Sequence, residues 1–100
     1  MNRCKAVIRD TRIVALQYWC PGCGIGHKVN LDADKGHPLW YWNGNLEKPT
    51  LSPSVNYPAR PRCHSFLREG RIEFLDDCDH AFAGKTVDAP DWEKGIDRNG

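Results

Sequence analysis

Residues 62–75 read RCHSFLREGRIEFL, and the Glu69-Gly70 pair divides them into two β-like runs. A two-residue turn at this pair predicts a hairpin in which Arg68 faces Arg71 and Cys63 faces Asp76. Side chains alternate between the two faces of a strand. If the second strand stays regular to its end, one face carries Cys63, Ser65, Leu67, Ile72, Phe74 and Cys78. The other face then carries His64, Phe66, Glu73, Leu75 and Asp77.

Strand signals also dominate the N-terminal third of the chain. Residues 4–19, CKAVIRDTRIVALQYW, are rich in Val, Ile, Tyr and Trp, and Asp10-Thr11 stands where a turn would divide two strands. Residues 18–24, YWCPGCG, combine two cysteines with a Pro-Gly pair, and residues 27–31 then alternate polar and apolar. This pattern predicts a hairpin whose turn is the cysteine knuckle.

The middle of the chain gives two further signals. Residues 39–42, LWYW, run into Asn43-Gly44, a pair typical of type I′ turns, so we expect strand pairing to continue into residues 45–46. Alternation places Trp40 and Trp42 on one face, and at least one of them is expected in the core. Residues 49–61 contain four prolines, which predicts an extended loop or edge segment.

Length and composition limit the class of protein. One hundred residues predict one small domain, which we place at residues 1–92 as a zinc-binding β domain, with residues 93–100 as a flexible tail. The net charge of +1 argues against nucleic acid or an anionic membrane as a partner. No apolar segment is long enough for a signal peptide or a membrane span, so a cytoplasmic location is expected. In that reducing compartment, five cysteines favour a metal over disulfides.

The two predicted hairpins together supply a metal site. Cys20 and Cys23 have the spacing of a zinc knuckle, and Cys63 and Cys78 are expected at one end of one face of the second hairpin. Four thiolates around one Zn2+ form a closed, structural site. Three histidines remain open as alternative ligands: His27, His64 and His80. Cys4 has no spaced partner and is expected to pack in a strand.

Several motifs taken together resemble a known family. They are CPGCG (20–24), WxWNG (40–44), PTLSPS (49–54), CHSF (63–66) and FLxDCxHxxAGxTV (74–87). This set resembles small phage and prophage proteins grouped as a domain of unknown function, sometimes mislabelled as ammonia monooxygenase. The resemblance covers most of residues 18–92. Relatives in bacterial operons for ubiquitin-like protein conjugation are proposed peptidases that act on the ubiquitin-like protein.

The motifs of those relatives are matched residue by residue. Their Ser-Leu-x-Pro-Ser segment corresponds to residues 50–54, with Thr50 in place of the first serine. Their Cys-x-Ser-His segment corresponds in part to residues 63–66, where the histidine precedes the serine. The resemblance implies a peptidase whose partner is a ubiquitin-like protein.

The chain offers the groups that a serine peptidase needs. Ser54 follows Pro53 in the proline-rich segment, His64 lies on the hairpin face opposite the cysteines, and Asp77 shares that face. Ser54 is the expected nucleophile, His64 the base and Asp77 the orienting acid. Ser52 and Ser65 are rival nucleophiles, and serine hydroxyls also cap ordinary turns.

We therefore expect a mainly β fold, a small antiparallel zinc-ribbon-like domain with little helix. The leading functional hypothesis is a phage-type, zinc-stabilised serine peptidase that acts on a bacterial ubiquitin-like protein, in the host cytoplasm if it is phage-encoded. An alternative is a non-catalytic zinc-binding module whose exposed Trp side chains and proline loop bind a protein. A third hypothesis, metal-dependent hydrolysis, requires an open zinc with three protein ligands and a water. The sequence does not specify the oligomeric state.

Overall fold

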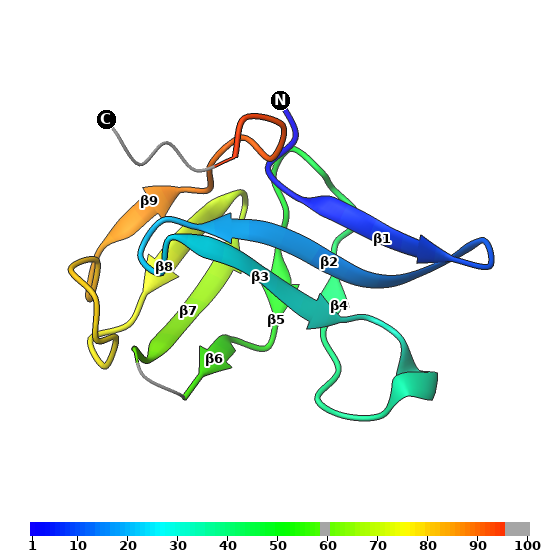
Figure 1. Ribbon diagram of the computed structural model, residues 1–100, viewed down its shortest axis with the longest axis horizontal. Coiled ribbons are helices and arrows are strands. Elements are labelled where there is room, and N and C mark those ends of the chain that lie inside the picture. The colour runs from blue at the N-terminus through cyan, green and yellow to red at the C-terminus, as the bar shows by residue number, and fades with distance from the viewer. Residues whose placement is uncertain (59–60, 96–100) are drawn as a thin grey trace.

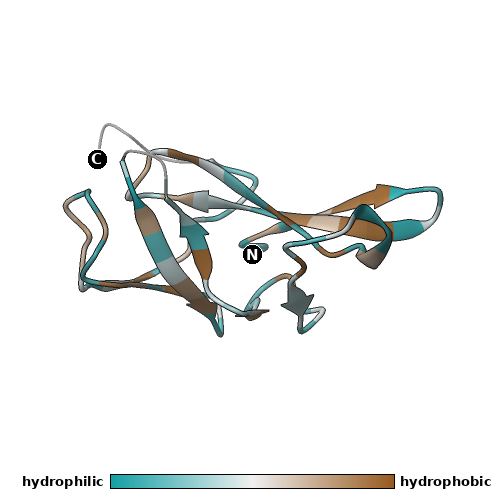
Figure 2. Cartoon of the chain, turned by 90° about the horizontal axis from the view of Figure 1, so that it is seen from below, coloured by the Kyte–Doolittle hydropathy of each residue, from teal (hydrophilic) through white to brown (hydrophobic). Residues whose placement is uncertain are grey.

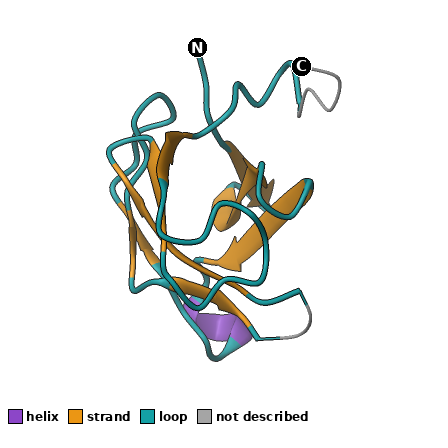
Figure 3. Cartoon of the chain, turned by 90° about the vertical axis from the view of Figure 1, so that its left-hand side faces the viewer, coloured by secondary structure: helices purple, strands orange, loops and turns teal. Residues whose placement is uncertain are grey.

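The computed structural model describes residues 1–58 and 61–95 and consists almost entirely of antiparallel strands (Figure 1). The strands are β1 (Lys5–Arg9), β2 (Arg12–Cys20), β3 (Ile25–Asn30), β4 (Tyr41–Trp42), β5 (Leu51–Ser52), β6 (Val55–Tyr57), β7 (Cys63–Arg68), β8 (Arg71–Phe74) and β9 (Thr86–Asp88). In the described part of the chain, the one helical element is the 3₁₀ turn η1 (Ala33–Lys35), drawn in purple in Figure 3. The expected mainly β class with little helix is confirmed. No helix within residues 1–58 and 61–95 is long and apolar enough to cross a membrane.

The N-terminal third forms a sheet in the order β1-β2-β3. Asp10 and Thr11 form its first turn with φ angles of 52° and 66°, the left-handed values that a type I′ turn requires. The cysteine knuckle forms the turn between β2 and β3, where the Gly24 N–H donates to the carbonyl of Cys20 at 2.8 Å. Both hairpins expected in this part of the sequence are present.

A second sheet has the order β6-β7-β8-β9 and contains the predicted 62–75 hairpin. Glu69 and Gly70 turn with φ angles of 50° and 78°. Arg68 pairs with Arg71, and the ladder continues to Ser65 opposite Phe74, as the turn predicts. This register is confirmed.

The end of that hairpin differs from the prediction. β8 stops at Phe74, and the N–H of Leu75 makes the last regular bond, to the carbonyl of His64 at 2.9 Å. The chain then loops out and returns where the Asp79 N–H donates to the carbonyl of Arg62 at 2.9 Å. Cys63 therefore does not face Asp76 in a ladder, because two acidic residues begin a turn there instead of extending the strand.

The Asn43-Gly44 pair also behaves differently from the prediction. β4 pairs with β5, Tyr41 facing Ser52, and not with residues 45–46. The Asn43 carboxamide oxygen accepts hydrogen bonds from the N–H groups of Asn45 and Thr50, both at 3.1 Å. These side-chain bonds compete with a tight hairpin and close a wider loop instead.

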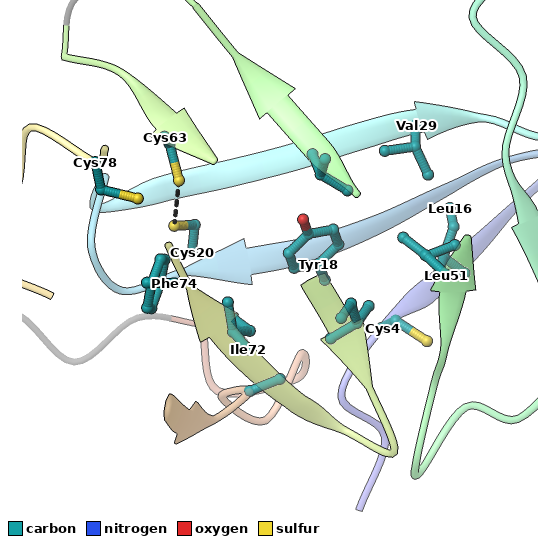
Figure 4. Close-up of a cluster of buried hydrophobic side chains, with 13 residues drawn as sticks. Cys4, Leu16, Tyr18, Cys20, Val29, Leu51, Cys63, Ile72, Phe74 and Cys78 are labelled. Atoms are coloured by element: carbon teal, nitrogen blue, oxygen red, sulfur yellow. Dashed lines mark hydrogen bonds between the residues drawn. The ribbon is translucent and has the colours of Figure 1, made fainter. Parts of the chain in front are cut away.

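The core lies between the two larger sheets, and Figure 2 shows hydrophobic and hydrophilic residues interspersed along the strands. Tyr18 occupies its centre with no exposed surface, between apolar side chains and a group of sulfur atoms (Figure 4). At one end of the fold, the indole of Trp19 stacks on that of Trp92 at 4.5 Å. This contact joins the first sheet to residues near the predicted tail. Residues 96–100 of that tail lie outside the described residues, and the boundary of the domain stays a prediction.

Candidate functional site

Strand register brings Ser54 close to His64. β6 pairs with β7 so that Asn56 faces His64, and Ser54 lies two positions before Asn56 on the same face. Diagonal neighbours of this kind are within reach of each other's side chains. The Ser54 Oγ lies 3.1 Å from the Nε2 of His64. A serine in the proline-rich segment and a histidine in the hairpin are thus joined directly.

Asp77 completes a chain of contacts on the other side of the imidazole. One of its carboxylate oxygens, Oδ2, lies 3.2 Å from the Nδ1 of His64 and 3.7 Å from a guanidinium nitrogen of Arg62. The sequence-based prediction put Asp77 on this face by extending the second strand of the hairpin. In the structure, the turn after β8 brings Asp77 to the same face. The predicted juxtaposition is therefore present, although the local backbone differs.

This geometry assigns roles to the two ring nitrogens. A carboxylate only accepts hydrogen bonds, so the Nδ1 of His64 carries the proton that faces Asp77. In the neutral ring, Nε2 then has a free lone pair that accepts the hydroxyl proton of Ser54. Ser54, His64 and Asp77 have the arrangement in which a histidine removes a proton from a serine and an acid orients the histidine.

The rival serines lie in different surroundings. Ser65 is 1% exposed on the core face of β7, so a substrate cannot reach its hydroxyl. Ser52 is exposed in β5, and within the described residues its hydroxyl makes no hydrogen bond to a histidine. Ser54 is half-buried. Of the three serines, it alone combines access with a base.

Trp40 holds the backbone at Ser54, a contact that the sequence did not predict. Its indole N–H donates to the carbonyl of Ser54 at 3.2 Å. Trp40 and Trp42 are both partly buried against the core, whereas Tyr41 between them is 70% exposed. An indole N–H that is removed from water needs an acceptor. The sequence alone does not show which carbonyl accepts from Trp40, because that depends on the pairing of β4 with β5.

A cluster of metal-binding side chains lies where the knuckle meets β7. The ligand atoms of Cys20, Cys23, His27 and Cys63 all lie within 4.8 Å of one another. The sulfur atoms of Cys20 and Cys63 are 3.8 Å apart, as the dashed line in Figure 4 shows. Two sulfur ligands of a tetrahedral zinc with bonds of about 2.3 Å are also about 3.8 Å apart. The donor set and its spacing fit such an ion.

A second cluster shares one of these cysteines. Cys63, Cys78 and His80 also have ligand atoms within 4.8 Å of one another. The structure therefore brings the predicted Cys63 and Cys78 together, but as a group distinct from Cys20 and Cys23. All five cysteines of the chain are free of disulfides. The remaining one, Cys4, is buried among core residues, but it lies directly before β1 and not within the strand in which it was expected.

The first cluster is electrostatically asymmetric. The hydrogen bond with Cys63 and the neighbouring His27 hold the pKa of the Cys20 thiol well below its usual range. The pKa of Cys63 is raised by its hydrogen bond with Cys20 and by burial, and burial raises the pKa of Cys23 to about 11. A divalent cation bound among these thiols would displace their protons, because zinc binds the thiolate form of cysteine.

Comparison with known families matches residues 2–75 of the chain to the model of the bacterial ubiquitination-like system serine protease (BubE). The chain belongs to the BubE family. The match includes residues 2–17, which the motif resemblance had left outside, and it includes Ser54 and His64. Asp77 follows two positions after its end. Comparisons with curated proteins and with solved structures gave no match for this BubE chain.

Proposed function

We propose that this BubE-family chain is a serine peptidase in which Ser54 is the nucleophile, His64 the general base and Asp77 the acid that orients His64. The observation that carries the proposal is the chain of contacts from the Ser54 Oγ through the imidazole to Asp77, at 3.1 Å and 3.2 Å. Membership of a serine protease family supports the same chemistry.

The proposed reaction follows from the assigned ring nitrogens. His64 Nε2 takes the hydroxyl proton as the Ser54 Oγ bonds to the carbonyl carbon of the scissile peptide. The tetrahedral intermediate collapses when the carbon–nitrogen bond breaks and His64 returns the proton to the leaving amine. Water then attacks the Ser54 ester, its proton passing to the same nitrogen, and the released serine hydroxyl recovers that proton. Asp77 stabilises the imidazolium that forms in each half of the reaction.

A polypeptide is the proposed substrate, and membership of a protease family of a ubiquitination-like system supports a ubiquitin-like protein. Cleavage at or after the C-terminus of that protein is part of the proposal. The side chains of His64 and Asp77 are 24% and 44% exposed. Such a shallow site suits an extended chain better than a small molecule, which usually binds in an enclosed pocket. A phage origin, implied by the motif resemblance, stays a prediction.

The proposed metal is one structural Zn2+ bound by Cys20, Cys23 and Cys63 with a fourth protein ligand. Cys20 has no exposed surface and Cys63 is 1% exposed, whereas Cys23 is half-buried, so the protein encloses most of a metal at this position. The burial favours a structural role, which joins the β2–β3 knuckle to β7, over metal-dependent hydrolysis. When bound, zinc would supply folding free energy.

Cleavage of a fusion protein tests the proposal. The substrate is the ubiquitin-like protein of a conjugation operon that contains a BubE gene, extended at its C-terminus by a reporter domain. Ser54→Ala is expected to abolish cleavage, whereas the matched control Ser52→Ala, an exposed serine of the same segment, is expected to retain it. Equal cleavage by wild type and Ser54→Ala would remove Ser54 from the mechanism.

A non-catalytic binding module is the second candidate, favoured by exposed apolar side chains. Tyr41 is 70% exposed and Ile13 is 46% exposed, and both border a shallow depression with Trp40 and Trp42. A binding module would form a stoichiometric complex with the ubiquitin-like protein and leave it intact. A peptidase would turn over many substrate molecules, so a time course at a tenfold excess of fusion protein separates the two candidates.

A further inference from the structure

His27 is a buried histidine whose two ring nitrogens lack hydrogen-bond partners. It is 2% exposed, and neither Nδ1 nor Nε2 has a partner among residues 1–58 and 61–95. The ring is held by stacking on Tyr57 at 4.2 Å and by an edge contact with Tyr18 at 5.5 Å. Leaving a buried polar atom without a hydrogen bond is destabilising, so such atoms usually have a partner that completes them.

The position of this ring suggests what the missing partner is. One of its nitrogens lies within 4.8 Å of the sulfur atoms of Cys20, Cys23 and Cys63. Neutral imidazole beside three thiols is a donor set for tetrahedral zinc. The burial, the absent hydrogen bonds and the three sulfur neighbours all point to a metal bound at His27.

Cys78 makes contacts that suit a neutral thiol. Its Sγ accepts the N–H of His64 at 3.3 Å and donates to the carbonyl of His64 at 3.2 Å. A zinc-bound thiolate has no proton to donate. A thiolate 3.2 Å from the carbonyl oxygen of His64 would be repelled by the partial negative charge of that oxygen.

His80 also makes hydrogen bonds that do not fit a zinc ligand. Its Nδ1 accepts the N–H of Phe82 at 3.2 Å, so in the neutral ring the proton is on Nε2. That Nε2 lies 3.5 Å from the sulfur of Cys63 and donates to it. A ligating histidine has the opposite pattern, with a lone pair on the metal and an N–H directed outward.

We propose that Cys20, Cys23, His27 and Cys63 bind the zinc, and that Cys78 stays a thiol that fixes the backbone of His64. The second role rests on the proposed function, because it concerns His64 as the catalytic base. Cys63 and His64 are consecutive residues, so the metal ligand and the base share one peptide unit. Cys78 bonds both backbone groups of His64 and acts as a positioning residue.

The zinc ligands are measured directly by X-ray absorption on the zinc-loaded, unmodified protein. The proposal predicts a shell of three sulfur atoms and one nitrogen atom. A shell of four sulfur atoms, or a shell with fewer than three, would overturn it. Because the nitrogen could come from another histidine, the same measurement is made on His80→Ala. This variant is expected to keep three sulfurs and one nitrogen, and loss of the nitrogen would assign that ligand to His80.

Two variants at Cys78 separate positioning from ligation. Cys78→Ala and Cys78→Ser are both expected to keep one zinc per chain with an unchanged shell. Cys78→Ala loses both sulfur hydrogen bonds to His64, and because thiol hydrogen bonds are weak, kcat is expected to fall about fivefold in total. Cys78→Ser, whose hydroxyl also donates and accepts, is expected to recover most of that loss.

Loss of zinc in both Cys78 variants would make Cys78 a ligand and refute the inference. Equal kcat in wild type and Cys78→Ala would refute the positioning role. If the unmodified protein had no peptidase activity, the proposed function would fail. The zinc shell would still decide between His27 and Cys78, because that measurement does not depend on activity.

Discussion

Replacing Asp77 with asparagine removes the charge that faces the imidazole while it keeps the shape of the side chain. Full charges 3.2 Å apart, the Asp77–His64 distance, would interact by about 1.3 kcal/mol in bulk water and by about 5 kcal/mol at an effective dielectric of about 20. The two side chains are 44% and 24% exposed, which places the pair between these limits. We take about 2–3 kcal/mol as the interaction free energy that Asp77→Asn removes. This is equivalent to a loss of roughly 30- to 150-fold in kcat/KM.

This loss is smaller than the roughly 10⁴-fold effect of the same change at a fully buried catalytic aspartate. Solvent reaches Asp77, and Arg62 lies 3.7 Å from the same carboxylate oxygen, so part of the charge is already balanced. The assay is kcat/KM on the ubiquitin-like fusion protein at substrate concentrations far below KM. Thermal unfolding is recorded in parallel, to show that the variant is folded.

The matched control is Asp76→Asn, which removes one exposed carboxylate at the neighbouring position. It is expected to change kcat/KM by less than about twofold, because a screened surface charge contributes little. If Asp77→Asn had the activity of the control, Asp77 would have no role in orienting His64. A loss above about 10⁴-fold would refute the estimate of a solvent-screened pair.

Three further predictions concern other parts of the fold. Gly70→Ala is expected to lower the free energy of unfolding by about 1–2 kcal/mol in a denaturant titration, because φ is +78° and the added methyl would lie 3.1 Å from the carbonyl oxygen of Glu47; an unchanged midpoint would contradict this. Burial raises the pKa of Cys4 to about 12, so about 10⁻⁴ of it is thiolate at pH 8. Peptide mapping after iodoacetamide treatment should find Cys4 unmodified in the folded protein and modified after denaturation. Trp40→Phe removes the N–H that donates to the carbonyl of Ser54 and should lower kcat/KM about fivefold; full activity would show that this bond does not position the nucleophile.

Where a turn fixes the register locally, the sequence was sufficient to predict the structure. Glu69 and Gly70 adopt the left-handed angles of a two-residue turn, and everything from Arg68 opposite Arg71 to Ser65 opposite Phe74 follows from them. Local signals failed where a side chain offered the backbone another partner. Asn43 accepts two backbone N–H groups and closes a loop, so its Asn-Gly pair did not form the expected hairpin.

The residues of the candidate site could be predicted from the sequence, but their contacts could not. Ser54 and His64 were identified as residues, but their contact depends on the pairing of β6 with β7, and a proline-rich segment carries no periodicity that would predict it. The environment of His27 was also out of reach. Its spacing after the knuckle made it a candidate ligand, but its burial between Tyr18 and Tyr57 depends on how the two sheets pack.

In the proposed mechanism, His64 activates Ser54 as the nucleophile. A fluorophosphonate probe forms a stable phosphonyl ester with an activated serine hydroxyl and leaves ordinary surface serines unmodified. Mass spectrometry of the intact protein followed by peptide mapping should find one adduct, on Ser54, in the wild type and none in Ser54→Ala. An adduct of equal yield in Ser54→Ala, or a wild-type protein that cleaves its substrate without being labelled at Ser54, would contradict the account.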